Sequence, residues 1–356
     1  MIAARLPIQR PLGAKLLLVD AQGAITHVPR SHFAGLLEPG DLVVANDAAT
    51  LPASLRGIHV RTGAPIEVRL AQRRTLDPAD VHEFVAVVFG AGDHHARTED
   101  RPPPPALAPG DALDLGPARA TIVKLLGHPR LVALRFEGSA RSIWAALARH
   151  GRPIQYAHVA SDLALWDVWT PIAGTPAAFE PPSAGFALDW RMLAELRARA
   201  IGFATLTHAA GISSTGDAAL DRRLPLDEPY RIPEATARAI ARTRRRGGRV
   251  VAIGTTVVRA LEAAAAADGR VHAGDGTATQ RIGPGTRLAV VDAILSGTHE
   301  PGSSHYELLG AFAGERTLQA ADRELEARGY RTHEFGDSVL VFSEALATAA
   351  SRAAAA

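Results

Sequence analysis

The sequence predicts an α/β protein: a layered α/β domain with a mostly parallel sheet, into which a small antiparallel β-barrel is inserted. Short strand-like runs separated by turns fill residues 57–151, whereas strand-like and helical runs alternate in the second half of the 356 residues. The early runs LLLVD (16–20) and LVVAND (42–47) are continuously apolar, as buried sheet strands are. We therefore assign residues 1–56 and 152–356 to the α/β domain and residues 57–151 to the barrel.

The first part of the chain has the pattern of short strands joined by turns. A hairpin pattern over residues 16–29, LLLVDAQGAITHVP, has a glycine at its turn, and the next strand ends at Asn46-Asp47. The barrel strands are expected in VRTGAPIEVRLA, EFVAVVFG, GDALDLG, ARATIVKLL and LVALRFEG. RPPPPALAPG (101–110) is a loop, because proline interrupts both helices and central strands.

In the second half, helical spacing alternates with apolar runs. It predicts helices over 189–200, 233–246, 257–267 and 318–329. Strands are expected within 202–211, 248–256, 286–295 and 337–345. We expect the tail, residues 347–356, to be frayed helix or disordered.

The composition excludes several classes of protein and of site. The chain has no cysteine, which excludes disulfides, thiolate metal ligands and a cysteine nucleophile. Residues 1–19 contain Arg5, Arg10 and Lys15 and do not predict a signal peptide, and no run approaches the roughly 20 apolar residues of a membrane span. We expect a cytoplasmic monomer that has no contact with a membrane.

Two charged clusters have an ordinary interpretation. The arginines of residues 238–249, in ARAIARTRRRGGR, could meet RNA phosphates, but a solvated helix end explains them more simply. His94-His95 lies in a polar loop, and we interpret the pair as solvated, because no further metal ligand is evident nearby in the sequence.

Gly254-Thr255-Thr256 follows an apolar run and opens a helical one. In a parallel sheet, ligands bind at the C-terminal ends of strands, and the first N–H groups of a helix attract polar or anionic oxygens. The three residues therefore predict either a nucleotide or sugar site, or a tight turn.

Nine segments in the right order resemble one family, the S-adenosylmethionine:tRNA ribosyltransferase-isomerases of queuosine biosynthesis. GGRVVAIGTTVVRALEA is especially similar to that family's GG-x-VIAVGTTSVRTLES. The other segments are IAARLPIQRPLGAKLLLVD, PGDLVVANDAATLPASLRG, GRPIQY, PSAGFAL, TLTHAAGIS, DEPYRI, THEPGSSHYELLGAF and FGDSVL.

The resemblance implies an α/β domain with an inserted barrel, and a transferase and isomerase that uses S-adenosylmethionine as ribosyl donor. A base removes a proton beside the sulfonium, and the aminomethyl group of a 7-deazaguanine in a tRNA anticodon attacks the ribosyl carbon. Adenine and methionine leave, and an epoxycyclopentanediol remains on the base. S-adenosylmethionine is then a substrate and tRNA a candidate partner, and we expect no separate cofactor and no metal.

On the matching segments we assign His299, Glu228 and Asp337 as catalytic. The residues that we assign to substrate binding are Asn46, Asp47, Ser183, Gly185, Gly254, Thr255, Thr256 and Arg259. Arg259 would hold a carboxylate such as that of methionine. Each has a structural alternative: an ion pair with Glu262 for Arg259, a turn cap for Asp337, an Asx turn for Asn46-Asp47, and a solvated side chain for His299.

Departures from the family's motifs are concentrated at its polar positions. Its threonine, arginine and histidine residues are replaced here by Ala48, Ala49, Ser54, Ala187, Thr207 and Leu226. Two functions therefore remain open. The chain is an enzyme that acts on tRNA or another acceptor, or it is a homologue that binds S-adenosylmethionine or a nucleoside and has lost the parent activity.

Overall fold

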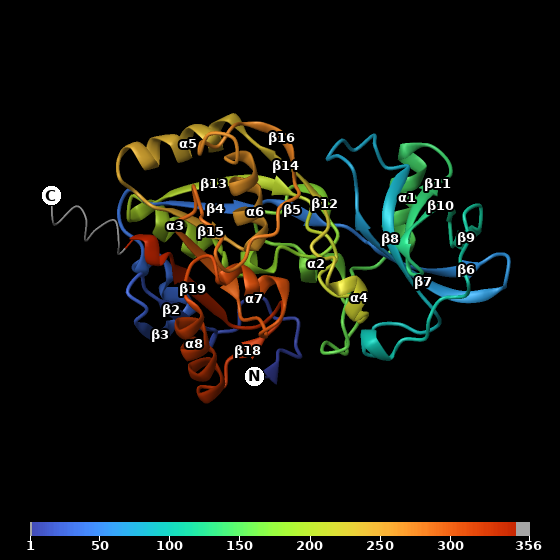
Figure 1. Ribbon diagram of the computed structural model, residues 1–356, viewed down its shortest axis with the longest axis horizontal. Coiled ribbons are helices and arrows are strands. Elements are labelled where there is room, and N and C mark those ends of the chain that lie inside the picture. Colours follow the sequence, from blue (N-terminus) through green and yellow to red (C-terminus); the bar gives the residue numbers. More distant parts are fainter. Residues whose placement is uncertain (1, 347–356) are drawn as a thin grey trace.

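The computed structural model describes residues 2–346, and it has two parts (Figure 1). A barrel lies at one end of the molecule, and a large sheet with helices forms the rest. The predicted fold class, an α/β domain with an inserted antiparallel barrel, is confirmed. The prediction for residues 347–356 falls outside the described residues.

The large sheet has nine strands. In spatial order they are β16 (Gly274–Ala278), β14 (Glu228–Ile232), β13 (Gly202–His208), β4 (Leu42–Asn46), β15 (Val250–Ile253), β17 (Ala293–Gly297), β19 (Ser338–Phe342), β2 (Lys15–Val19) and β3 (Ile25–Pro29). The strands β13, β4, β15 and β17 are parallel neighbours. Antiparallel strands flank them, so the sheet is mixed, with its parallel part at the centre.

One predicted strand is shorter than its apolar pattern. LAVV (288–291) lies outside β17, which begins at Ala293. The backbone N–H groups of Val290 and Val291 donate instead to the carboxylate of Glu262, at 3.0 and 2.9 Å. A side chain therefore supplies the acceptors that a neighbouring strand would otherwise provide.

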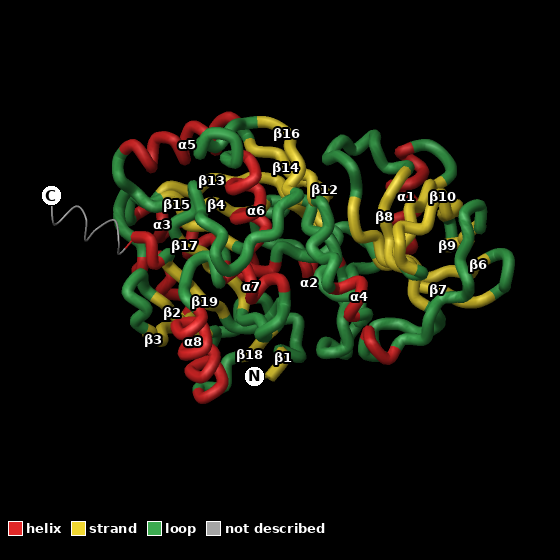
Figure 2. Tube along the Cα trace, viewed as in Figure 1, coloured by secondary structure: helices red, strands yellow, loops and turns green. Residues whose placement is uncertain are grey.

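Helices cover both faces of the sheet (Figure 2). The helices are α1 (Ala140–His150), α2 (Leu165–Val168), α3 (Trp190–Ala198), α4 (Ala218–Asp221), α5 (Glu234–Arg245), α6 (Thr255–Ala264), α7 (Ser304–Leu309) and α8 (Glu315–Ala327). Apolar residues of α5, α6, α7 and α8 share one core with Val44 and Ala252, and those of α3 share another with Val43 and Val251. Alternate residues of each strand thus pack into the cores on opposite faces of the sheet, which explains why the strand sequences are continuously apolar.

The barrel is closed and antiparallel. Its strands, in order around it, are β10 (Ala118–His128), β11 (Leu131–Phe136), β8 (Glu83–Phe89), β7 (Ala64–Gln72), β6 (Ser54–His59) and β9 (Ala112–Leu115). Ile143 and Leu147 of α1 pack into the same core. The domain limits given above stay a prediction, although β6 already begins at Ser54.

Two short parallel sheets tie distant segments together. They are β5 (Ala48–Thr50) with β12 (Thr175–Ala178), and β1 (Ile2–Ala3) with β18 (Arg331–Thr332). The β5–β12 pair lies next to the sheet on the side of the barrel (Figure 1). Over residues 2–346, no helix has the length and apolar character that crossing a bilayer requires.

Candidate functional site

A pocket opens at the C-terminal ends of the central parallel strands. Gly254, Thr255 and Thr256 follow β15 and line it, together with His299 after β17 and Ser213 after β13. Because these strands are parallel to β4, their C-terminal ends reach the same edge of the sheet. His299 and the Gly-Thr-Thr turn therefore lie on the same rim of the pocket.

Gly254 shapes the turn between β15 and α6. Its φ is +91°, which L side chains rarely adopt, and a Cβ atom there would lie 3.2 Å from the Cβ of Ala184. Thr255 and Thr256 form the first turn of α6, where backbone N–H groups have no partner within the helix. The Thr256 hydroxyl accepts a hydrogen bond from the amide of Asn46 at 3.4 Å. The turn therefore offers the pocket both hydroxyl and N–H groups.

His299 and His305 form a stacked pair in the pocket. Their ring centroids lie 4.6 Å apart with an interplanar angle of 14°. His305 belongs to α7, which begins after Ser303, whose hydroxyl caps the backbone N–H of Tyr306. Burial, with the neighbouring histidines, lowers the pKa of His299 well below its usual value, and burial also lowers that of His305. Both rings are therefore neutral at pH 7.

Glu180 is the acidic residue of the pocket that the sequence analysis missed. Its side chain is buried, and burial raises its pKa to about 7, against hydrogen bonds from Ser213 and Tyr156 that lower it. The Tyr156 hydroxyl donates to Glu180 Oε1. A carboxyl group that titrates near neutrality inside a pocket is a candidate general base. The only signal in the sequence is an acidic residue directly after an apolar run, in AAFEPP.

Glu228 also lines the pocket, but its carboxylate is already engaged. It accepts from the backbone N–H of Gly211 at 2.6 Å and from the guanidinium of Arg259. His208, fully buried, has its Nε2 3.4 Å from the Glu228 carboxylate. Burial raises the pKa of Glu228 and, with Arg259, lowers the pKa of His208 well below its usual value.

The structure contradicts the expected position of Arg259. Its guanidinium is buried against Glu228 and the carbonyl oxygens of Leu226 and Ala278, and it is not among the described residues that line the pocket. The alternative pairing with Glu262 is also wrong, because that carboxylate binds backbone N–H groups. Arg281 does line the pocket; its side chain is 47% exposed, and its guanidinium donates to the carbonyl of Arg222 at 2.9 Å and lies 3.6 Å from the Glu307 carboxylate.

Asp337 is displaced from the expected catalytic role as well. Its carboxylate accepts from the backbone N–H groups of Lys15 at 2.7 Å and Arg331 at 2.9 Å. It therefore joins β2 to β18, and it is not among the residues found around the pocket in the described part of the chain. The structural alternative, an aspartate that caps a turn, describes this geometry.

The remaining predicted residues lie at or behind the pocket. Ser183 lines it. Asn46 and Asp47 lie behind the lining: Asn46 also donates to the carbonyl of His208, and Asp47 accepts from the hydroxyl of Thr207 at 2.6 Å. Gly185 packs against Thr170, where a Cβ atom would approach to 2.9 Å. They support the neighbouring strands and turns, and their roles in binding stay predictions.

Two groups of side chains within residues 2–346 have the ligand types and spacing for a metal ion. One is His158, His333 and Glu334, close to the pocket. His158 Nε2 already lies 2.9 Å from the Glu334 carboxylate, and the rings of His158 and His333 stack with their centroids 4.2 Å apart. The other is Asp93, His94 and His95 in the barrel. The expectation of no metal stays a prediction.

Comparison with known proteins identifies the family. Residues 1–341 match the model of the family described as "Queuosine biosynthesis protein". The S-adenosylmethionine:tRNA ribosyltransferase-isomerase of Gloeobacter violaceus is 35% identical over 92% of this chain and 89% of its own, and that of Sorangium cellulosum is 35% identical over 96% and 95%. The solved structure of S-adenosylmethionine tRNA ribosyltransferase from Thermotoga maritima, 24% identical, covers 96% of both chains with a TM-score of 0.51 and shows the same fold. The chain therefore belongs to the S-adenosylmethionine:tRNA ribosyltransferase-isomerase family, a family of enzymes.

Proposed function

We propose that this protein transfers and isomerises the ribosyl group of S-adenosylmethionine onto a 7-deazaguanine base of tRNA, in the cytoplasm, without a separate cofactor. Family membership over residues 1–341 supports the reaction class. The observation that carries the proposal to this chain is Glu180, a buried carboxyl group with a pKa of about 7 in the pocket at the strand ends. In this proposal Glu180 supplies the catalytic base, because this chain lacks several polar residues of the family's motifs.

Glu180 takes the proton beside the sulfonium in this proposal. A general base works best when its pKa lies near the working pH, because it is then ionised in part and still basic enough to accept a proton. The phenol of Tyr156 and the hydroxyl of Ser213 hold the carboxylate in place. The neutral rings of His299 and His305 present no positive charge that would repel the sulfonium.

The substrate's other groups have partners around the same rim. The hydroxyls and N–H groups of Thr255 and Thr256 suit ribose oxygens, since the N-terminus of a helix attracts polar oxygens. Arg281, rather than Arg259, is the arginine to hold the methionine carboxylate, because it lines the pocket and is 47% exposed; the substrate carboxylate would replace Glu307, 3.6 Å from its guanidinium.

The pocket must widen to admit this substrate. Its cavity volume is about 90 Å³ in this conformation, whereas small-molecule sites typically enclose roughly 300–1,000 Å³. The lining includes residues 210–213, in the segment after β13, and His299, Ser304 and His305, in the segment after β17 and at the start of α7. Displacement of these segments is the simplest way to open the site, because the strands behind them are fixed by their ladders.

The tRNA approaches the pocket side of the sheet in this proposal. The arginine cluster lies elsewhere: Arg242, Arg245 and Arg246 are exposed at the C-terminal end of α5, before β15 begins, whereas the pocket follows the end of β15. They therefore remain a solvated helix end here. The monomeric state stays part of the proposal.

The experiment is incubation of the purified chain with S-adenosylmethionine and tRNA that carries the aminomethyl-deazaguanine base. Release of adenine and methionine, with the epoxycyclopentanediol on the tRNA nucleoside by mass spectrometry, is expected. Binding of S-adenosylmethionine without release of adenine would instead favour the alternative, a binding homologue that has lost the parent activity.

A further inference from the structure

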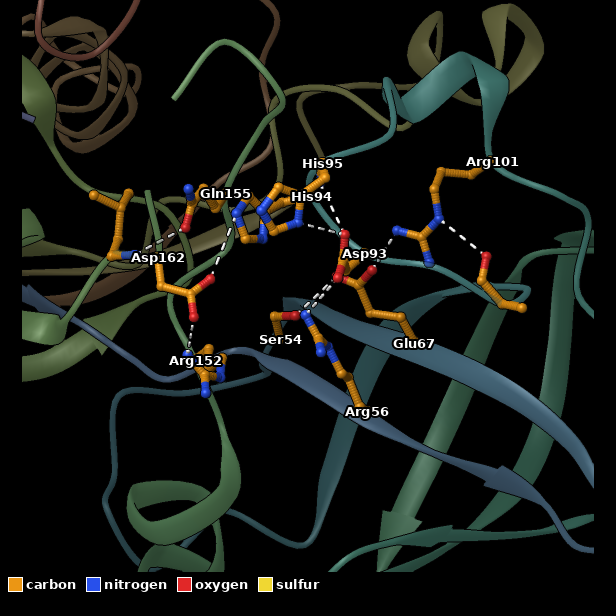
Figure 3. Close-up of polar contacts among 12 residues, drawn as sticks. Ser54, Arg56, Glu67, Asp93, His94, His95, Arg101, Arg152, Gln155 and Asp162 are labelled. Carbon is orange, nitrogen blue, oxygen red and sulfur yellow. Dashed lines mark hydrogen bonds and ion pairs between the residues drawn. The ribbon is translucent and has the colours of Figure 1, made fainter. Parts of the chain in front are cut away.

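A second cavity, of about 580 Å³, lies between the barrel and the segment that follows α1. Figure 3 shows its polar side chains, which come from β6 and β7, from the loop after β8, and from residues 152–162. The cavity is separate from the proposed substrate pocket, with which it shares no lining residue.

Three consecutive residues of the loop after β8 lie together at this cavity, and two of them, Asp93 and His94, line it. Asp93 accepts from both the backbone N–H and the ring Nδ1 of His95, at 3.0 and 2.9 Å. The rings of His94 and His95 lie 4.2 Å apart. One ligand atom from each of Asp93, His94 and His95 lies within 4.8 Å of the other two.

The expectation that this histidine pair is solvated is wrong for His94. Its side chain is only 9% exposed, and its Nε2 has no hydrogen-bond partner among the described residues. The ring also lies close to the backbone of Ala160. A buried ring nitrogen that has no hydrogen-bond partner can offer its lone pair to a metal ion when the other ring nitrogen carries the proton.

Asp162 faces the same nitrogen from the other side of the cavity. Its Oδ1 lies 3.6 Å from His94 Nε2, while its Oδ2 accepts from Arg152 at 3.1 Å. Asp93 is held in the same way, with Oδ2 on Arg56 at 3.0 Å and Oδ1 toward His95. Each carboxylate is thus anchored by an arginine through one oxygen, and its other oxygen points to an imidazole (Figure 3).

We propose that Asp93, His94 and His95 form a binding site for Zn²⁺ or a chemically similar divalent transition-metal ion, and that Asp162, whose Oδ1 lies 3.6 Å from His94 Nε2 but outside the group of three, moves in as the closing ligand when the ion binds. Two imidazoles and two carboxylates make the four-ligand N/O set that Zn²⁺ accepts. Ca²⁺ and Mg²⁺ prefer all-oxygen sites, so the imidazoles disfavour them.

The bound ion would join two segments that no described strand ladder connects. Asp93, His94 and His95 belong to the loop between β8 and β9, whereas Asp162 lies in the segment after α1 that leads back to the α/β part. A metal that is held by both would fix the barrel loop against this segment and raise the stability of the folded protein by mass action.

The test uses the untagged, full-length protein after treatment with a chelator, with ZnCl₂ as the probe in a calorimetric titration and in thermal unfolding. We expect one equivalent of Zn²⁺ to bind and to raise the melting temperature. CoCl₂ should give a visible ligand-field spectrum, which depends on direct coordination. His94→Asn should weaken binding at least about tenfold, which is about 1.4 kcal/mol.

The matched control is His272→Asn, because His272 pairs with Asp268 at 3.1 Å on an exposed surface and offers no third ligand. It should bind Zn²⁺ as the unaltered protein does. If His94→Asn does not fold, Asp162→Asn, which replaces an exposed side chain, takes its place. No binding below a dissociation constant of about 0.1 mM, or equal binding by the altered and control proteins, would overturn the proposal. None of these measurements depends on ribosyl transfer.

Discussion

Replacement of Glu180 by glutamine tests the proposed base while it keeps the size and the hydrogen-bonding shape of the side chain. Glu180 is buried, and its pKa rises from 4.5 to about 7, which corresponds to a free-energy difference of about 3 kcal/mol between its two protonation states. The carboxylate at pH 8 is therefore a basic group held at a cost in stability. Glutamine cannot accept the proton, so turnover should fall roughly 10²- to 10⁴-fold.

The assay is adenine release from S-adenosylmethionine with saturating modified tRNA, measured from pH 5.5 to 8.5. For the unaltered protein, turnover should increase about tenfold per pH unit below a pKa of about 7 and level off above it. Glu180→Gln should lose this ascending limb. The exposed Glu38→Gln serves as control and should leave the profile unchanged. Retention of turnover within about threefold by Glu180→Gln, with the same pH profile, would refute Glu180 as the base.

The same substitution has an opposite effect on stability. A carboxyl group whose pKa is higher in the folded than in the unfolded state favours its protonated form on folding, so the protein loses stability as the pH rises from 4.5 through about 7. The loss from Glu180 amounts to about 3 kcal/mol and is complete above pH 7. Glutamine has no charge to bury, so Glu180→Gln should unfold at a higher temperature than the unaltered protein at pH 8, and at a similar temperature at pH 4.5. A loss of activity that comes from misfolding would show the reverse.

Two further substitutions examine the rim. Thr256→Val removes the hydroxyl that Asn46 contacts and should weaken S-adenosylmethionine binding about fivefold. The ligand should then raise the melting temperature less than it does for the unaltered protein. An equal rise in melting temperature would exclude Thr256 from the site. His299→Ala should lower turnover or substrate affinity with little change in melting temperature, because the half-buried ring stacks on His305 in the pocket wall. A lowered melting temperature with normal kinetics would instead assign His299 a structural role.

The sequence predicted those features that depend on local pattern. The hairpin of β2 and β3, the strands of the barrel, and the turn of Gly254 between β15 and α6 all follow from periodicity and turn residues. LAVV was predicted as strand because it is apolar, but the N–H groups of Ala289, Val290 and Val291 donate to Glu262, which lies 27 to 29 positions earlier. No local pattern reports such a long-range hydrogen bond.

The site was predicted less well, because the role of a polar residue depends on which groups surround it. Asp337 and Arg259 matched family motifs, yet both are engaged within the fold. The Asp337 carboxylate accepts hydrogen bonds from backbone N–H groups, and the Arg259 guanidinium pairs with Glu228. Glu180 lies between Phe179 and two prolines, and nothing in that stretch reveals that its carboxyl group is buried beside Tyr156. A raised pKa arises from desolvation, which is a property of the folded state.

The charge of the substrate has a further consequence for Glu180. A sulfonium bound beside this carboxyl group favours its ionised form, so S-adenosylmethionine should lower the pKa of Glu180 from about 7 and generate its own base on binding. Proton release and binding are then linked, and affinity should increase with pH between about 6 and 8. Isothermal titration in two buffers of different ionisation enthalpy measures the released proton directly. Glu180→Gln should bind with much less proton release and a weaker pH dependence in this range, because burial lowers the pKa values of His299 and His305 and so favours their neutral forms. Proton release that persists in Glu180→Gln would place the titrating group elsewhere in the pocket.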